Sequence, residues 1–278
     1  MSFLQRLLAL QQRRDSLLCV GLDPEPERFP EPWRGDSARI FDFCARIVDA
    51  TKDLVCAFKP QIAHFAAQRA EEQLERLIGY IRRVAPDVPV ILDAKRGDIG
   101  STAEQYAREA FVRYQADAVT LSPYMGFDSL EPYLAYDGRG LILLCRTSNE
   151  GGSDLQSRAM ASGERLYEYV AKLAAGSWNK SGRLGLVVGA TFPAELARVR
   201  ELAPKLLLLI PGVGAQGGDA RASVAAAWRP DGPIVVNSSR AVLYAGGGEG
   251  FAASAREAAR TTRELLADAR AACVLGPR

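Results

Sequence analysis

The chain has 278 residues, of which 48% are hydrophobic and 24% are charged, a composition typical of one or two globular α/β domains. Its 35 basic and 33 acidic residues nearly cancel to a net charge of +2, which argues against a track for polyanions or a membrane-surface patch. No apolar run approaches the roughly 20 residues that cross a bilayer, and residues 1–14 lack the apolar block and cleavage site of a signal peptide. We therefore expect a cytoplasmic protein that binds neither nucleic-acid polymers nor membranes.

Cysteine and histidine usage argues against a metal site. The chain has five scattered cysteines in no CxxC pair, which favours free thiols in a reducing compartment. The one histidine, His64, has no adjacent nucleophile or metal-binding partner, so we interpret it as a supporting residue and not as a general base. No bound metal or cofactor is expected.

Short apolar runs alternate with segments of helical periodicity along the chain. Residues 1–14 predict a short amphipathic helix. Apolar runs that predict buried parallel strands cover residues 17–20, 55–58, 88–92, 118–121, 141–144, 184–188, 206–210 and 234–236. Helices are expected at residues 40–48 (capped by Asp36 or Ser37), 74–81, 101–115, 128–136, 157–177, 193–203, 217–227 and 249–270.

Eight strand–helix units with no Pro/Gly/Ser linker predict one domain over residues 1–278, a (β/α)8 TIM barrel with a short N-terminal helix. A doubly wound open sheet is the structural alternative. In such barrels the active site lies at the carboxyl ends of the strands. The polar residues that follow the apolar runs therefore predict a composite site: Asp23, Lys59, Asp93, Lys95, Asp98, Ser122, Arg146, Ser148, Gln216 and Arg240.

The most informative segment carries alternating charges. Asp93 and Lys95 are two residues apart on a predicted strand, so their side chains point to the same face. Asp98 follows in the loop, and Lys59 comes from an earlier strand end. In a Lys–Asp–Lys–Asp array each charge is flanked by opposite charges, which keeps all four ionised. A purely structural ion-pair network is the alternative, but burying charges costs desolvation energy and is weak evidence for stability.

A glycine-rich loop predicts a phosphate site. Gly212, Gly214, Gly217 and Gly218 surround Gln216, after an apolar strand and before a helix, where backbone N–H groups can approach an anion. Arg240, after the last strand, can add a bidentate contact. The alternative is a flexible surface turn. We interpret the second glycine run, residues 246–250, as the loop into the last helix, because no strand directly precedes it.

These motifs resemble a known family. The motif Asp93-x-Lys95-x-x-Asp98, continuing as Ile-Gly-x-Thr102, resembles the signature of orotidine 5′-monophosphate decarboxylases. Residues 211–219 and 236–240 resemble that family's seventh and eighth strand loops. Gly-Leu-Asp23-Pro and Phe-Lys59-Pro resemble its first and second strand ends. The resemblance spans roughly residues 15–245. The length of the chain and the motifs Lys95-Arg-Gly-Asp98 and Arg146-Thr-Ser-Asn149 resemble the longer bacterial branch of the family (type 2).

The resemblance implies a cofactor-free carboxy-lyase that converts orotidine 5′-monophosphate to uridine 5′-monophosphate, the last step of pyrimidine nucleotide synthesis. Lys95 would protonate C6 of the pyrimidine, and Asp93 would face the substrate carboxylate. Asp23 and Lys59 would contact the ribose hydroxyls. The other implied positions are Ser148 or the adjacent Thr147 for the base, Gln216 and Arg240 for the phosphate, and Asp98 and Thr102 for the partner's site in a homodimer.

Two departures from the family and two rival functions remain. Glu150 stands where relatives often carry proline, and Ser239 where compact relatives carry glycine. The nearest rival is a Mg²⁺-dependent decarboxylase of 3-keto-L-gulonate 6-phosphate, but those relatives place a metal-binding Glu where this chain has Lys59. The other rival is a non-catalytic barrel that binds a phosphorylated ligand, which would not need the whole charge array.

Overall fold

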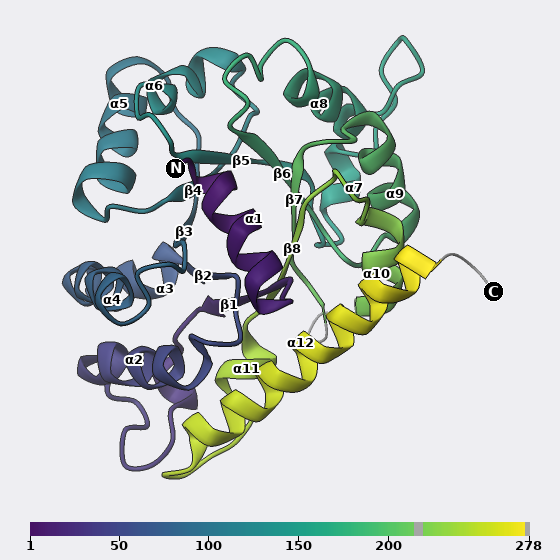
Figure 1. Ribbon diagram of the computed structural model, residues 1–278. Coiled ribbons are helices and arrows are strands. Elements are labelled where there is room, and N and C mark those ends of the chain that lie inside the picture. The colour runs from purple at the N-terminus through teal and green to yellow at the C-terminus, as the bar shows by residue number, and fades with distance from the viewer. Residues whose placement is uncertain (214–218, 276–278) are drawn as a thin grey trace.

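The computed structural model describes residues 1–213 and 219–275. Within these residues, eight parallel strands form a barrel surrounded by helices (Figure 1). The strand order is β2-β1-β8-β7-β6-β5-β4-β3, and the bridges Phe58–Val90 and Gln61–Asp93 join β2 to β3. The predicted barrel is therefore confirmed, and the open doubly wound sheet is wrong. The strands are β1 (Leu18–Leu22), β2 (Ala57–Pro60), β3 (Ile91–Arg96), β4 (Ala118–Leu121), β5 (Gly140–Arg146), β6 (Leu184–Val188), β7 (Leu207–Ile210) and β8 (Ile234–Ser238).

Several strands continue beyond the apolar runs that predicted them. β2 includes Lys59, β3 includes Asp93 and Lys95, and β8 includes Asn237. Strand pairing uses backbone groups, so a polar side chain does not end a strand when it points toward a cavity. Lys59, Asp93, Lys95 and Asn237 consequently stand on the strands themselves and not on loops.

Small and branched side chains fill the barrel interior. Residues two apart on a strand share a face, as Leu207 and Leu209 do on β7. The interior cluster consists of Cys19, Cys56, Ala57, Ile91, Ala118, Ile142, Val187, Leu207, Leu209 and Val235, joined by Phe3 and Leu7. This packed core leaves the carboxyl ends of the strands as the place for a site.

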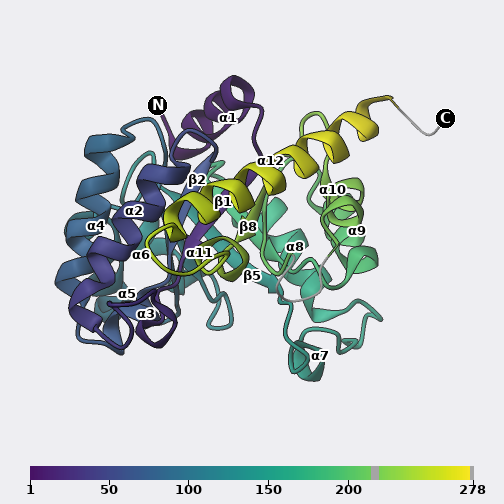
Figure 2. The same ribbon diagram turned by 90° about the horizontal axis from the view of Figure 1, so that it is seen from below.

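Helix α1 (Phe3–Arg14) closes the amino-terminal end of the barrel. Figure 1 shows it lying across the barrel, and Figure 2 places it at the end opposite α7. Its Phe3 and Leu7 pack into the interior cluster, and Gln11 Nε2 donates to the carbonyl of Ile234 at 2.7 Å. The predicted amphipathic helix is thus a plug for the barrel core.

Two helix predictions need correction. The helix expected at 157–177 is α8 (Leu166–Ala175), preceded by the short α7 (Gly152–Leu155). Gly163 has a φ of +81°, which interrupts the helical path. Asp36 caps a 3₁₀ turn, η2 (Ser37–Arg39), and not the following helix. The other helices are η1 (Pro26–Arg28), α2 (Ile40–Thr51), α3 (Ile62–Ala66), α4 (Glu71–Val84), α5 (Gly100–Arg108), the π-helix η3 (Glu109–Arg113), η4 (Phe127–Ser129), α6 (Glu131–Leu134), α9 (Pro193–Leu202), α10 (Ala220–Ala227), α11 (Arg240–Leu243) and α12 (Phe251–Leu275).

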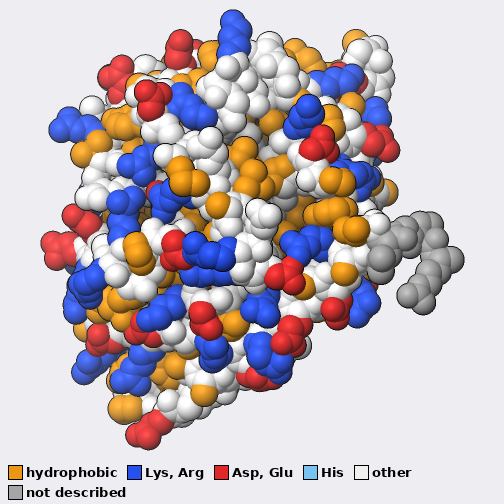
Figure 3. Space-filling model, in the orientation of Figure 1, with side chains coloured by type: hydrophobic (Ala, Val, Ile, Leu, Met, Phe, Trp, Pro, Cys, Tyr) orange, Lys and Arg blue, Asp and Glu red, His pale blue; other side chains and the backbone are white. Residues whose placement is uncertain are grey.

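The face that carries α1 mixes basic, acidic and hydrophobic side chains without separating them by type (Figure 3). Among the described helices, none is both long and apolar enough to span a bilayer. The thiols of Cys19, Cys44, Cys56 and Cys145 are free and buried, and Cys273 is partly exposed.

Candidate active site

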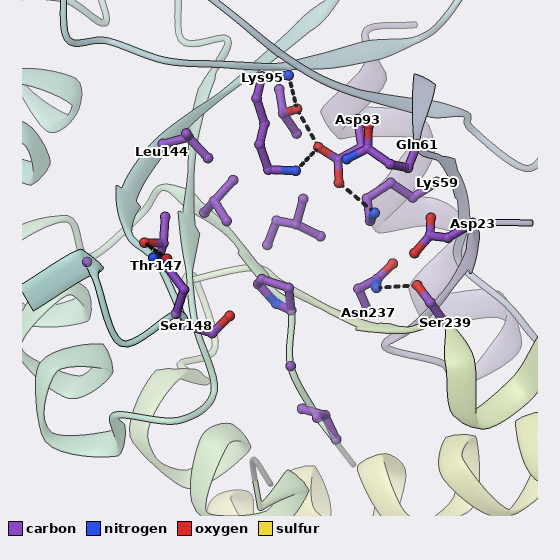
Figure 4. Close-up of a pocket in the computed structure, with 18 of the residues that line it drawn as sticks. Asp23, Lys59, Gln61, Asp93, Lys95, Leu144, Thr147, Ser148, Asn237 and Ser239 are labelled. Carbon is purple, nitrogen blue, oxygen red and sulfur yellow. Dashed lines mark hydrogen bonds and ion pairs between the residues drawn. The ribbon is translucent and has the colours of Figure 1, made fainter. Parts of the chain in front are cut away.

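The carboxyl ends of the strands open into a cavity of about 590 Å³. It lies at the end of the barrel opposite α1, where α7 and the loop after β5 form one wall (Figure 2). Figure 4 shows Lys59, Asp93 and Lys95 on one side and Thr147 and Ser148 on the other. Of the residues that the sequence predicted for the site, the cavity is lined by Asp23, Lys59, Asp93, Lys95, Ser148 and Arg240.

Asp93 lies between two lysines. Lys59 Nζ is 2.7 Å from Asp93 Oδ2, and Lys95 Nζ is 2.6 Å from Asp93 Oδ1. Lys59 is 4% exposed and Asp93 7% exposed, whereas the Lys95 side chain is 45% exposed. Lys95 is therefore the cation of this trio that reaches into the open cavity.

The lysines keep Asp93 ionised in spite of its burial. Burial by itself raises the pKa of Asp93, but Lys59 and Lys95 lower that pKa to well below its usual range. Burial likewise opposes the charge on Lys59, but the carboxylates of Asp93 and Asp23 raise the pKa of Lys59 above its ordinary value. The site thus holds fixed charges of both signs across the neutral pH range.

Thr120 of β4 holds this arrangement in place, although it is not among the site residues predicted from the sequence. Its hydroxyl donates to Asp93 Oδ1 at 2.8 Å and accepts from the backbone N–H groups of Ala94 and Lys95, each at 3.0 Å. The β3–β4 register shifts between Leu92 and Arg96, and Lys95 has a φ of +48°. A left-handed non-glycine residue of this kind is strained, and such strain clusters at functional sites. A hydroxyl side chain within the apolar run 118–121 was the sequence feature that could have predicted a role for Thr120 in the site.

The remaining cavity wall combines an apolar surface with two further polar side chains. Leu144, Val187 and Leu209 face the cavity, and they exclude water from around the charges. Gln61 and Asn237 also line it. Neither residue was predicted from the sequence, because Gln61 follows the lysine of its strand end and Asn237 comes directly after an apolar run.

Thr147 and Ser148 both line the cavity, but they differ in their contacts. Thr147 Oγ1 lies 2.6 Å from Asn149 Oδ1 and accepts from Gln156 Nε2 at 2.9 Å, so local partners use its hydroxyl. Ser148 is half-buried, and its carbonyl accepts from Thr191 Oγ1 at 3.3 Å. Both side chains are thus placed at the cavity wall.

Arg146 supports this loop from behind and does not line the cavity, so its place in the predicted site is wrong. Its side chain is 1% exposed, pairs with Glu195 and stacks 4.1 Å from the Phe192 ring centroid. It also donates to Thr147 O at 3.1 Å and to Ser153 Oγ at 3.1 Å. The guanidinium therefore fixes the segment that carries Thr147 and Ser148.

We expect Glu195→Gln to lower the free energy of unfolding by about 3 kcal/mol, because it leaves the buried Arg146 charge without a counter-ion. Urea unfolding measures the change. Glu201→Gln is the matched control, since Glu201 lies on the same helix in an exposed pair with Arg198 and should change stability by less than about 0.5 kcal/mol. Equal losses in the two variants would contradict the structural role of Arg146.

Asp98 and Thr102 do not line this chain's cavity. Asp98 is half-buried, and its Oδ1 accepts from the N–H of Ile99 at 2.9 Å. Thr102 is exposed on α5. Ser122 also lies outside the cavity lining. His64 does line it, and its Nδ1 lies 3.3 Å from the carbonyl oxygen of Pro24.

Part of the predicted phosphate site lies within the residues that the structure describes. Arg240 is exposed, begins α11 and lines the cavity together with Gly212 and Val213. Ser239 lines it as well, so the serine in place of glycine contributes a side chain to the site. Gln216 and the glycines 214, 217 and 218 lie outside the described residues. Among the residues described, no three His, Cys, Asp or Glu side chains are grouped to hold a metal ion.

Comparisons with known proteins agree with this geometry. Residues 16–256 match the model of the orotidine 5′-phosphate decarboxylase / HUMPS family. The chain is 73% identical to orotidine 5′-phosphate decarboxylase of Methylibium petroleiphilum, over 97% of this chain and 100% of that protein. It is 69% identical to the enzyme of the same name from Paracidovorax citrulli, with the same coverage. The solved structure of Leishmania donovani OMP decarboxylase superposes with a TM-score of 0.85 at 40% identity, covering 98% of this chain and 100% of that one. The resemblance seen in the motifs is confirmed, and the chain belongs to the orotidine 5′-phosphate decarboxylase family.

Proposed function

We propose that this protein decarboxylates orotidine 5′-monophosphate to uridine 5′-monophosphate, as the last step of pyrimidine nucleotide synthesis. The observation that carries the proposal is the Lys59–Asp93–Lys95 trio at the floor of a cavity of about 590 Å³. Family membership over residues 16–256 supports the same reaction.

The proposed reaction needs a cation at one ring carbon. When the bond between C6 and the carboxylate breaks, its electron pair stays on C6 and carbon dioxide leaves. No ring system delocalises this vinylic carbanion, so a fixed ammonium group is the most effective stabiliser. Lys95 Nζ supplies that charge and then transfers a proton to C6, which completes uridine 5′-monophosphate.

Asp93 both orients Lys95 and faces the carboxylate that departs. Its lowered pKa keeps it negative, so it repels the substrate carboxylate until carbon dioxide forms. Lys59 balances this buried charge from 2.7 Å away. Lys59 also disfavours the Mg²⁺-dependent sugar-phosphate reaction, because its ammonium would repel a cation at that strand end.

Binding groups surround the reacting centre. We assign the ribose hydroxyls to Asp23 and Lys59, the base to Ser148, and the phosphate to Arg240 together with Gln216. The phosphate is remote from C6, so its binding energy can be used to position the substrate carboxylate against Asp93.

The first experiment follows the ultraviolet absorbance of orotidine 5′-monophosphate with and without EDTA. Rapid turnover that the chelator does not change supports the proposed metal-free reaction. Absence of turnover would exclude the nucleotide reaction, and phosphorylated sugar acids with Mg²⁺ would then be the substrates to test.

We also propose a homodimer with shared sites, in which Asp98 and Thr102 reach the cavity of the partner. Both residues lie outside the cavity lining of their own chain. Exposed apolar side chains stand nearby in the loops after β3 and β4: Ile99 (47% exposed), Tyr124 (77%) and Met125 (47%). Apolar side chains at this rim are suited to an interface between two copies.

Mixing two inactive variants tests this arrangement. In a dimer of Asp98→Ala with Lys95→Ala, one of the two sites contains neither substitution, so we expect activity to return to about a quarter of wild type in an equal, fully exchanged mixture. Each variant alone, treated in the same way, is the control. No recovery after subunit exchange has been verified by mass would contradict shared sites.

A further inference from the structure

Two side chains at the carboxyl ends of neighbouring strands line the cavity and carry a buried oxygen atom without a hydrogen-bond partner among the described residues. Asp23 Oδ1, just after β1, and Asn237 Oδ1, on β8, have no hydrogen-bond partner within residues 1–213 and 219–275. Both residues line the cavity, and β1 and β8 are neighbours in the barrel. Figure 4 shows the two side chains on the same side of the cavity, below Lys59. Because a buried acceptor without a donor is unfavourable, this pair points to donor groups on a ligand.

A hydrogen bond anchors the Asn237 amide. Its Nδ2 donates to Ser239 Oγ at 3.1 Å, which leaves Oδ1 as the atom available to a ligand. The side chain is 7% exposed. Gly21 of β1 provides the space, because a Cβ there would lie 1.8 Å from Ser239 Oγ and 3.2 Å from Asn237 Oδ1. The Asn237–Ser239 pair and the glycine opposite it therefore form a built polar site.

The chemistry of this site selects a particular part of a nucleotide. A phosphate or carboxylate brings only acceptors at neutral pH, so neither can satisfy Asn237 Oδ1. A ribose carries two adjacent O–H donors, which match two neighbouring acceptor oxygens. A neutral amide also supplies an acceptor in the cavity that Asp23 and Asp93 line, without adding a third negative charge to it.

We propose that Asn237 Oδ1 accepts a hydrogen bond from a ribose hydroxyl of the substrate, and that Asn237 is thereby a specificity-determining residue for ribonucleotides over deoxyribonucleotides. The inference rests on the proposed function, since it takes orotidine 5′-monophosphate as the substrate. Ser239 is the positioning residue that turns the amide oxygen toward the sugar.

The test compares kcat/KM for orotidine 5′-monophosphate with that for its 2′-deoxy and 3′-deoxy analogues. Asn237→Leu keeps the side-chain volume and removes the acceptor. We expect it to lower kcat/KM for the ribonucleotide by about 10- to 100-fold and for one deoxy analogue by less than about 3-fold. The preference for the ribonucleotide over that analogue, expressed as a ratio of kcat/KM values, is then smaller in Asn237→Leu than in the wild type by the ratio of these two losses. Ser238→Ala is the matched control, because Ser238 is the next residue of β8 and does not line the cavity.

An equal loss of kcat/KM for all three substrates would overturn the proposal, because a merely structural role affects every substrate alike. If Asn237→Leu does not fold, Ser239→Ala replaces it and is expected to reduce the same preference, since the amide loses its anchor. An unchanged preference in Ser239→Ala would likewise overturn the proposal. Failure of the wild type to turn over orotidine 5′-monophosphate would reject the proposed function instead, so the two failures are distinguishable.

Discussion

Replacing Lys95 by alanine is expected to lower kcat/KM for orotidine 5′-monophosphate by about 10⁴-fold or more. The ammonium group has two tasks, stabilising the carbanion and protonating C6. Losing a preorganised electrostatic group typically costs 10²- to 10³-fold, and losing a general acid typically costs 10²- to 10⁴-fold. The two effects act on one transition state, so a loss near the sum of their free energies is expected.

The fold should tolerate this change. The Lys95 side chain is 45% exposed, and Asp93 keeps Lys59 as its counter-ion. Alanine retains the Cβ, so the backbone strain at φ +48° is the same in both proteins. Steady-state kinetics with circular dichroism separates activity from folding. Lys52→Ala, which breaks the exposed pair with Asp49, is the control and should retain full activity. Near-normal turnover by Lys95→Ala would exclude Lys95 as the acid.

Asp93→Asn is expected to remove activity and stability together. The substitution leaves the buried Lys59 without its carboxylate, and breaking a buried ion pair costs about 3–5 kcal/mol of unfolding free energy. We expect kcat/KM to fall by about 10³-fold or more, because Lys95 loses its orienting partner and the substrate carboxylate loses the charge that repels it.

A second substitution separates these two losses. In Asp93→Asn/Lys59→Met neither member of the buried Lys59–Asp93 pair is left without the other, so stability should return to within about 1 kcal/mol of wild type while activity stays absent. Denaturant unfolding and turnover measured on the four proteins of the cycle provide the comparison. If the single variant Asp93→Asn unfolds like wild type, the buried pair contributes nothing and our account of the site is wrong.

The pKa shifts determine the pH range for these measurements. The pKa of Asp93 is lowered, so its contribution to stability is complete above its unfolded pKa of about 3.9 and is lost as pH falls through the folded value. The pKa of Lys59 is raised, so its contribution is complete below about 10.4 and is lost as pH rises through the folded value. The stability difference between wild type and Asp93→Asn should therefore be constant from pH 5 to 9 and shrink in strong acid.

The sequence by itself determined the barrel and the centre of its site. Apolar runs covered on both faces and separated by helical periodicity specify parallel strands, and polar residues at their carboxyl ends meet because all eight strands point the same way. Lys59, Asp93 and Lys95 were predictable for this reason. The spacing of Asp93 and Lys95 placed them on one face, although the strand between them is irregular.

Only the tertiary structure separated the groups that face the cavity from those behind it. Arg146 and Ser148 are two residues apart on one strand end, yet Arg146 is buried against Glu195 and Ser148 lines the cavity. Thr120 stands within an apolar run, and its partner Asp93 becomes visible only when β3 and β4 are side by side and in register. Asn237 comes directly after an apolar run, and only the closed barrel shows that it lines the cavity. Local periodicity reports which face a residue occupies, but the contacts across the barrel depend on strand register and on the space that residues such as Gly21 leave open.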